Sequence, residues 1–465
     1  MNRNLKYIYL NLPSVLQTIL VSSNGLFNFL KRKGGGYKDY LKFYNQSYYW
    51  EEGKIEEYQT KQLVSLISEL IKYTSYPGIK INEEFNYNLH EGPYSILCNF
   101  CFIEKDVIRE KFNSVVNNNP KRKPVLITQT SGTTGTPLIV QYDKDSIYRS
   151  FALWKRFHNI IGLPKRFKSV RFSGRILIKS EKSNPPFWCY NYFERQLLMS
   201  SYHLTTENMR YYVQKLNQFK PLLIDGYPSA IYTLAYYINH SNSKLDFKLK
   251  AVATTAETLH DYQRKEIEKA FDCKVYNQYA SSEGGPFITE CTSGTLHLNL
   301  DSGVFEFYNK EGNVAQPGEI AEMIVTSFRQ LKTPLVRYRT GDFVRIPKDS
   351  SGVCSCGSTM PHVVEILGRD DDMLYTNDKG FIGRMDPAYK GLTGIVKSQI
   401  IQHDLNNVEI VQIVDKKYTA IVEKLFLRNL RDRLGSEVNI VISNVDSIPL
   451  GNNGKFKTVI RKFEI

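Results

Sequence analysis

The feature that most constrains this chain is an alternation of short apolar segments with amphipathic segments in its central part. Strand followed by helix and then strand is typical of sheets whose strands run parallel. The sequence therefore predicts an α/β fold with a largely parallel sheet. The predicted strands are 221–225, 249–255 and 274–279. One predicted helix follows Gly226-Tyr227-Pro228-Ser229 and continues to about Asn239, and a second spans 260–271.

The sequence changes character at about residue 296, where short alternating segments separated by glycines predict a smaller antiparallel region. The length of 465 residues suggests two or three domains. We expect an N-terminal α/β region over 1–368, with a β-rich part at about 290–366, and a small C-terminal α+β domain over 369–465. Further predicted strands are 296–300, 303–308, 319–327, 335–338 and 437–443, with a helix at 422–434.

Charge and cysteine content exclude several classes of protein. The formal net charge of +14 is spread along the chain, and short runs such as Lys31-Arg32-Lys33 and Lys121-Arg122-Lys123 favour a solvated basic surface. A non-catalytic nucleotide- or nucleic-acid-binding protein is the alternative of another class. No basic stretch with interleaved aromatic residues supports specific binding of nucleic acid. Seven cysteines do not form an even disulfide framework, so we expect a cytoplasmic protein.

Residues 7–30 carry no charge, but Asn11, Pro13 and Gly25 are among the residues that interrupt them. A spanning helix needs about 20 predominantly apolar residues. No membrane span is predicted, and peripheral contact with a membrane stays open as an alternative.

A loop rich in glycine and hydroxyl groups follows a predicted buried strand at 124–128. Glycines let the backbone approach a phosphate, and hydroxyls add hydrogen-bond donors. The alternative is a simple hairpin turn. The loop consists of Thr130, Ser131, Gly132, Thr133, Thr134, Gly135, Thr136 and Pro137.

Four further motifs contain groups suited to nucleotide chemistry, although each could be an ordinary loop. An aromatic residue can stack on a base, and a nearby carboxylate can hold Mg²⁺ beside phosphates. An Asp after a glycine can accept hydrogen bonds from ribose hydroxyls, and a Lys on a turn is a point charge suited to phosphate. The motifs are Tyr279-Ala280-Ser281-Ser282-Glu283, Tyr338-Arg339-Thr340-Gly341-Asp342, Gly368-Arg369-Asp370-Asp371-Asp372 and Gly454-Lys455.

The order of these five motifs, from residue 130 to residue 455, resembles the adenylate-forming superfamily of acyl-CoA synthetases, nonribosomal-peptide adenylation domains and luciferases. Within it the chain looks most like phenylacetate–CoA ligases and the CapK-like proteins of surface-polysaccharide gene clusters. The elements that carry this closer resemblance are Phe187-Trp188-Cys189-Tyr190-Asn191, Tyr202-His203-Leu204, Gly226-Tyr227-Pro228-Ser229 and Cys354-Ser355-Cys356-Gly357.

The resemblance implies an adenylate-forming ligase fold whose C-terminal domain is a mobile lid, and an ATP-dependent, AMP-forming carboxylate ligase. Residues 131–136 would surround the triphosphate, and Asp371 would be the hinge of the lid. Lys455 would stabilise the phosphate during attack by the acid, and rotation of the lid would then admit the acceptor. The implied nucleotide contacts are Ala256, Glu257 and Tyr279 at adenine, Ser282 at the α-phosphate, Glu283 at Mg²⁺, and Asp342 and Arg369 at ribose.

Two acceptors are consistent with the sequence. The resemblance to phenylacetate–CoA ligases implies the thiol of CoA. After Asp372, however, the chain reads Met-Leu-Tyr-Thr-Asn-Asp-Lys-Gly instead of the apolar run and glycine of acyl-CoA synthetases. This departure favours an amine or hydroxyl acceptor, giving an amide or ester of a sugar acid or amino acid in capsule or O-antigen polysaccharide biosynthesis.

Four residues outside these motifs are of the types that bind structural zinc: Cys291, His297, Cys354 and Cys356. Three thiolates and one imidazole satisfy tetrahedral Zn²⁺, although four unrelated residues are the alternative. Their local sequences look like exposed turns. His203 also has two interpretations, as a residue beside the substrate carboxylate or as a core histidine.

Overall fold

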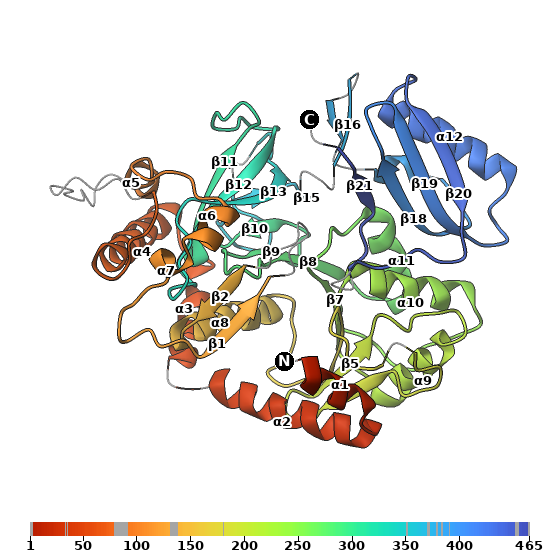
Figure 1. Ribbon diagram of the computed structural model, residues 1–465, viewed down its shortest axis with the longest axis horizontal. Helices are drawn as coiled ribbons and strands as arrows, with labels where there is room; N and C mark the ends of the chain where they lie inside the picture. Colours follow the sequence, from red (N-terminus) through yellow and green to blue (C-terminus); the bar gives the residue numbers. More distant parts are fainter. Residues whose placement is uncertain are drawn as a thin grey trace. The chain divides into compact units, whose positions relative to one another are not determined.

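The computed structural model in Figure 1 divides the chain into two compact units, which are described separately. The first unit comprises Met1–Leu26, Arg166–Val275 and Leu367–Ile465, and the second comprises Phe27–Lys165 and Tyr276–Ile366. The structure describes residues 3–32, 34, 36–78, 92–130, 138–179, 181–349, 352–369, 373–377, 380–382, 385–389, 391–451 and 455–463.

The first unit contains the predicted parallel sheet. Strand β3 (Ser169–Ser173) lies between β5 (Gln196–Ser200) and β6 (Leu223–Gly226), and β6 also pairs with β7 (Ala251–Thr254), all in parallel. Strand β4 (Trp188–Asn191) pairs with β5 in the antiparallel direction. The sheet packs through side chains such as Phe172, Ile224 and Val252 against α9 (Met209–Phe219), α10 (Pro228–His240) and α11 (Asp261–Phe271). The α/β prediction is thereby confirmed.

The C-terminal part of the first unit is a smaller α+β layer. Its sheet has the order β20–β19–β18–β21, and α12 (Ala420–Leu434) covers one face (Figure 1). Phe426, Leu430 and Leu434 of this helix pack on Ile400 and Ile410 of the sheet. The strands are β16 (Leu374–Thr376), β17 (Gly380–Ile382), β18 (Ile395–Gln402), β19 (Asn407–Val414), β20 (Asn439–Asn444) and β21 (Val459–Arg461).

The second unit combines helices with antiparallel strands. One sheet has the order β8–β9–β10–β14, and β11, β12 and β13 form another antiparallel ladder. The helices are α3 (Tyr37–Ser47), α4 (Glu52–Tyr73), α5 (Pro93–Leu97), α6 (Lys105–Glu110), α7 (Phe112–Val115) and α8 (Lys144–Ile160). The strands are β1 (Leu126–Gln129), β2 (Ile139–Tyr142), β8 (Val275–Tyr279), β9 (Ile288–Glu290), β10 (Leu296–Leu298), β11 (Gly303–Tyr308), β12 (Ile320–Ser327), β13 (Tyr338–Arg345) and β14 (His362–Val363).

Two local predictions were wrong. The strand expected to be buried at 124–128 is β1, which pairs only with β2 among the described strands and leaves Ile127 60% exposed. The strand expected at 335–338 instead begins at Tyr338 and continues to Arg345, so Gly341 and Asp342 lie within a strand. A shift of register opposite Glu322 and Ile324 accommodates this segment, in which Gly341 has a φ of +69°.

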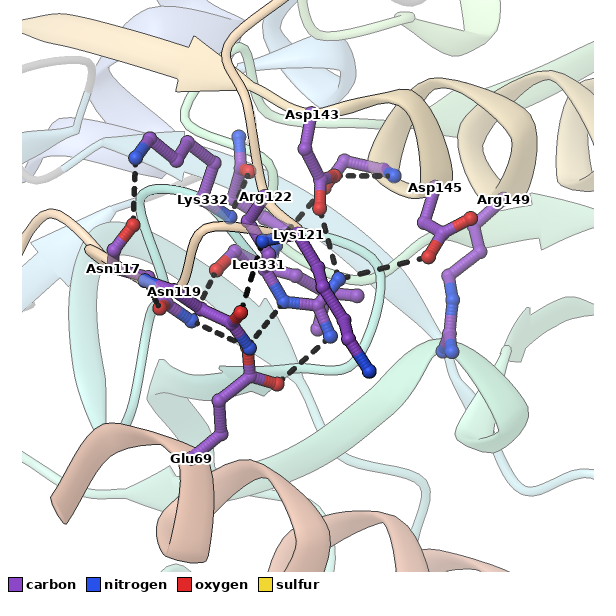
Figure 2. Close-up of polar contacts among 12 residues, drawn as sticks. Glu69, Asn117, Asn119, Lys121, Arg122, Asp143, Asp145, Arg149, Leu331 and Lys332 are labelled. Atoms are coloured by element: carbon purple, nitrogen blue, oxygen red, sulfur yellow. Dashed lines mark hydrogen bonds and ion pairs between the residues drawn. The ribbon is translucent and has the colours of Figure 1, made fainter. Parts of the chain in front are cut away.

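The basic run at 121–123 is not wholly solvated, because Arg122 joins a polar network (Figure 2). Its guanidinium contacts Glu69 of α4 and, at 2.9 Å, Asp143. Asp143 caps α8 by accepting the backbone N–H of Ser146 at 2.8 Å. The network therefore ties α4 and α8 to the segment that leads into the β1–β2 hairpin.

Candidate functional site

The predicted phosphate loop connects β1 to β2, and its residues 131–137 lie outside the described residues. Thr130 stands at the base of this loop and is buried. Its backbone N–H donates to the carbonyl oxygen of Leu138 at 2.9 Å, and its Oγ1 accepts the N–H of Leu138 at 3.1 Å. This pair of hydrogen bonds closes the base of the loop.

Two predicted nucleotide-binding motifs meet in the second unit. The hydroxyl of Tyr279, at the end of β8, donates to Asp342 Oδ2 of β13 at 2.6 Å, across 63 residues of sequence. The backbone N–H of Asp342 donates to Thr340 Oγ1 at 3.0 Å. These contacts orient the Asp342 carboxylate, which the resemblance assigns to ribose.

Glu283, the predicted ligand of Mg²⁺, is buried and forms an ion pair with Lys105 of α6, with Nζ 3.0 Å from Oε1. Its other oxygen accepts the Ser282 hydroxyl at 3.3 Å. The carbonyl oxygen of Ser282 in turn accepts the Tyr142 hydroxyl at 2.8 Å. A buried carboxylate of this kind is a suitable hard donor for Mg²⁺.

In the first unit, the carboxylate of Glu257 links the turn after β7 to the C-terminal segment that carries Lys455. Oε2 accepts the N–H of Ser229, at the start of α10, at 3.1 Å. Oε1 accepts the N–H of Phe456 at 2.8 Å, across 199 residues. Ala256 precedes it with a φ of +71°. Burial raises the pKa of the Glu257 carboxyl, while the two N–H donors and Lys455 oppose this rise.

A second lysine stands beside this carboxylate. Lys397 of β18 lies over the ring of Phe456 as a cation–π contact, with Nζ 4.2 Å from the ring centroid. Burial lowers the pKa of Lys397 to about 8, and Glu257 partly offsets this effect. His260 adds a further contact, since its Nε2 lies 3.1 Å from Thr458 Oγ1.

Of the two remaining predicted lid residues, Arg369 ends β15 (Glu365–Arg369) in the first unit, and Asp371 lies outside the described residues. Lys105 and Lys397 were missed by the sequence analysis. Neither belongs to a recognisable motif, and each reaches its carboxylate only through the tertiary fold.

His203 is buried, and both of its ring nitrogens contact groups of the protein. Nδ1 lies 2.7 Å from Ser200 Oγ, and Nε2 lies 3.0 Å from the carbonyl oxygen of Lys179. The ring also stacks on Phe187 with centroids 5.1 Å apart. These contacts favour the core-histidine interpretation over contact with a substrate.

The four predicted zinc ligands come together in the second unit. The ligand atoms of Cys291, His297, Cys354 and Cys356 all lie within 4.8 Å of one another. Cys356 Sγ lies 3.5 Å from His297 Nε2, and Cys291 Sγ lies 3.9 Å from Cys354 Sγ. His297 Nδ1 lies 2.7 Å from the carbonyl oxygen of Met360, so it carries the proton and leaves Nε2 available for a metal.

The surroundings of these ligands differ from the expected exposed turns, because Cys291 and His297 are buried. Cys291 follows β9, and His297 lies on β10, which pairs with both β9 and β14. Burial raises the pKa of the Cys291 thiol, but backbone N–H groups of Thr295 and Ser293 outweigh it and bring the pKa below its usual range. Donor types and geometry therefore fit a closed tetrahedral site.

Comparisons with known proteins identify relatives of this chain and of its fold. A family model described as the CapK C-terminal domain matches residues 374–462. Protein CapK of Staphylococcus aureus is 32% identical over 470 residues, covering 99% of this chain and 100% of that protein. Phenylacetate-coenzyme A ligase of Pseudomonas putida is 25% identical over 296 residues, covering 60% of this chain and 62% of that protein.

Among solved structures, 2-hydroxyisobutyryl-CoA ligase in its postadenylation state, in complex with 2-HIB-AMP, matches with a TM-score of 0.67. The two sequences are 15% identical, and the match covers 90% of this chain and 91% of that chain. This likeness concerns the fold, whereas the full-length similarity to CapK concerns the family. The chain therefore belongs to the CapK family and has the fold of the adenylate-forming CoA ligases.

Proposed function

We propose that this protein is an ATP-dependent, AMP-forming carboxylate ligase. The observation that carries the proposal is the contact between Tyr279 and Asp342, which joins two motifs that are far apart in sequence and that the resemblance assigns to nucleotide binding. The names of the relatives add support, since several are acid–CoA ligases. The chemical classes of the substrate acid and of the acceptor are also part of the proposal.

In the proposed first step, a carboxylate oxygen of the acid attacks the α-phosphorus of ATP, and the bond to the bridging oxygen of the β-phosphate breaks. Pyrophosphate leaves, and the acid becomes an acyl-adenylate. Lys455 neutralises charge on the phosphate during this displacement, Asp342 holds the ribose, and Ser282 contacts the α-phosphate. Mg²⁺, held by Glu283, would supply charge neutralisation at the phosphates.

In the second step the acceptor attacks the acyl carbon, the mixed anhydride bond breaks, and AMP leaves. A thiol gives a thioester, and an amine or hydroxyl gives an amide or ester. Relatives that are CoA ligases favour the thiol. The polar sequence after Asp372 and the match to the CapK C-terminal model favour the amine or hydroxyl. Product analysis with each acceptor distinguishes the two.

The proposed test measures pyrophosphate release with Mg·ATP over a panel of aryl acids, sugar uronic acids and amino acids. CoA, hydroxylamine or no acceptor is added, and wild type is compared with Lys455→Ala. We expect release that depends on one class of acid and falls at least about 100-fold in the variant. If the protein does not bind ATP, or if release does not depend on the acid, the proposal is wrong.

We also propose that Cys291, His297, Cys354 and Cys356 hold a structural Zn²⁺. The metal would link β9 and β10 to the turn before β14 and take no part in the reaction. Metal analysis of purified protein should give about one zinc per chain, lost in Cys291→Ser. Purified protein without zinc, with unchanged thermal stability after addition of a chelator, would contradict this assignment.

A further inference from the structure

Helix α2 (Ser14–Arg32) presents an apolar face to the outside of the protein. Val15 is 71% exposed, Ile19 is 53% exposed and Leu20 is 48% exposed. Val15 and Ile19 are four residues apart, as are Leu16 and Leu20, which places these pairs on one side of the helix. The complete set of exposed large apolar side chains on this helix is Val15, Leu16, Ile19, Leu20, Phe27 and Leu30.

The side of α2 that faces the protein is largely polar or small, which reverses the usual pattern of a surface helix. Gln17 Nε2 donates to the carbonyl oxygen of Tyr9 at 3.1 Å. Ser22 Oγ donates to the carbonyl oxygen of Tyr190, on β4, at 3.0 Å. Gly25 packs so closely on Asn191 that a Cβ would lie 2.1 Å from its Oδ1. These three contacts fix which face of α2 is turned outward, even though Val21 also packs inward on a small apolar cluster.

Exposed aromatic and apolar side chains lie close to this face. Tyr192, 64% exposed, follows β4, and its backbone N–H donates to Ser22 Oγ at 3.3 Å. Phe193 is exposed next to it. On α1 (Arg3–Asn11), Tyr7 and Ile8 are exposed as well. Tyrosine is enriched at the interface between a membrane and water, where its ring and its hydroxyl meet different surroundings.

Lysines border the start of α2. Six lysines and arginines precede the first acidic residue of the sequence, Asp39. Lys179 Nζ contacts Asn11 Oδ1, at the end of α1, at 3.4 Å. Lys182 Nζ contacts Ser14 Oγ at 3.1 Å, which places another cation at the start of α2. Glu181 is next to it in sequence. An apolar face with a basic border complements a bilayer that contains anionic lipid.

We propose that α2 and the adjacent exposed residues bind the surface of a membrane containing anionic lipid. The helix lies in the plane of the interface, with Leu16 and Leu20 among the acyl chains and the lysines at the phosphates. None of the described helices is long and apolar enough to cross a membrane. The inference is independent of the proposed ligase activity.

The test is co-sedimentation of the full-length protein with vesicles of phosphatidylcholine alone or with added phosphatidylglycerol. The double variant Leu16→Glu with Leu20→Glu is compared with a matched control, Ile421→Glu with Val441→Glu. The control residues are exposed apolar side chains on α12 and β20. Thermal unfolding and circular dichroism of each variant show whether its fold is intact.

We expect wild type and control to bind the anionic vesicles, with binding weakened by salt, and the Leu16/Leu20 variant to bind at least about tenfold less while unfolding like wild type. Three results would overturn the proposal: no binding by wild type, equal binding by both double variants, or a concentration-dependent dimer that dissociates in the Leu16/Leu20 variant without any vesicle binding. The last result would assign the face to a second copy of the chain.

Discussion

In the second unit, two side chains predicted to hold the nucleotide contact each other directly. In the first unit, the position of the predicted catalytic lysine depends on the neighbouring backbone, which is hydrogen-bonded to the carboxylate of Glu257. Tyr279, on a strand, orients Asp342, on another strand. Lys455 instead precedes Phe456, whose N–H is bound by Glu257. The first arrangement is fixed before a nucleotide arrives. The second can be released by breaking a few hydrogen bonds, as the proposed rotation of the lid after adenylation would require.

Among the contacts compared above, the largest expected effect comes from Asp342→Asn. The amide keeps the shape of the side chain but removes the negative charge that would accept the ribose hydroxyls and the Tyr279 hydroxyl. We expect kcat/KM for ATP to fall about 100-fold, or about 2.7 kcal/mol, mainly through KM. Steady-state kinetics at varied ATP measure this. Tyr279→Phe should give a smaller loss in the same direction, and an unchanged KM in both variants would contradict the nucleotide role.

Arg122→Gln breaks the network that ties the β1–β2 hairpin to α4 and α8. Glu69 and Asp143 would then lose their cation, so we expect the free energy of unfolding to fall by about 2 kcal/mol. Denaturant titration measures the loss. Lys121→Gln, one residue away on an exposed side chain, is the control and should leave stability unchanged.

The same network predicts a dependence on pH. Burial raises the pKa of Glu69, but hydrogen bonds from Arg122 and Asn119 outweigh it and hold the pKa below its usual range. A lowered pKa gives stability that is present above the ordinary carboxyl pKa and is lost as the pH falls through the folded-state value. Stability measured toward acid should therefore fall more steeply in wild type than in Arg122→Gln. Parallel curves would show that the ion pair has no such role.

Glu257→Ala tests whether the Glu257 carboxylate positions the segment that carries Lys455 in the first unit. Without the carboxylate, the N–H groups of Ser229 and Phe456 lose their acceptor, and Lys455 is less well positioned. We expect pyrophosphate release to fall about tenfold, or about 1.4 kcal/mol, while transfer from added acyl-adenylate to the acceptor, which would need Glu257 only at the adenine, falls less. Glu257→Gln keeps a carbonyl acceptor and should retain more activity. Equal loss in both half-reactions would indicate a general defect instead.

Lys397→Met should have the smallest effect. Because the pKa of Lys397 is lowered to about 8, the folded protein holds fewer protons than the unfolded chain between there and the ordinary lysine pKa of 10.5, so wild-type stability rises with pH across this window. The variant should lose that rise and gain about 1 kcal/mol at neutral pH. A wild-type stability curve that is flat over this window would contradict the burial of this amine.

The sequence predicted much of the fold, because the alternation around 221–279 is repeated and strongly patterned. The strands at 303–308 and 320–327 were also close to their predicted bounds. The prediction from sequence failed at β1, where an apolar run lies at the surface. It also failed at β13, where Gly341 suggested a turn but lies within an irregular strand. The pattern of apolar residues within a segment does not show whether other elements pack against both of its faces.

For the candidate site, the sequence named the residue types but not their partners. The pairs Lys105 with Glu283 and Glu257 with Phe456 join residues that are 178 and 199 positions apart. No spacing rule finds such contacts, since they depend on tertiary packing. The four cysteine and histidine ligands could be predicted because cysteine and histidine are uncommon in this sequence. In the structure their ligand atoms lie within 4.8 Å of one another.

The most direct test of adenylation follows the oxygen atoms. Once the panel has identified an acid, its carboxylate is labelled with a heavy oxygen isotope, and the AMP released with the acceptor is analysed by mass spectrometry. Attack of the carboxylate on the α-phosphorus predicts that one labelled oxygen appears in AMP and none in pyrophosphate. Unlabelled AMP, or label in phosphate or pyrophosphate, would contradict an acyl-adenylate intermediate.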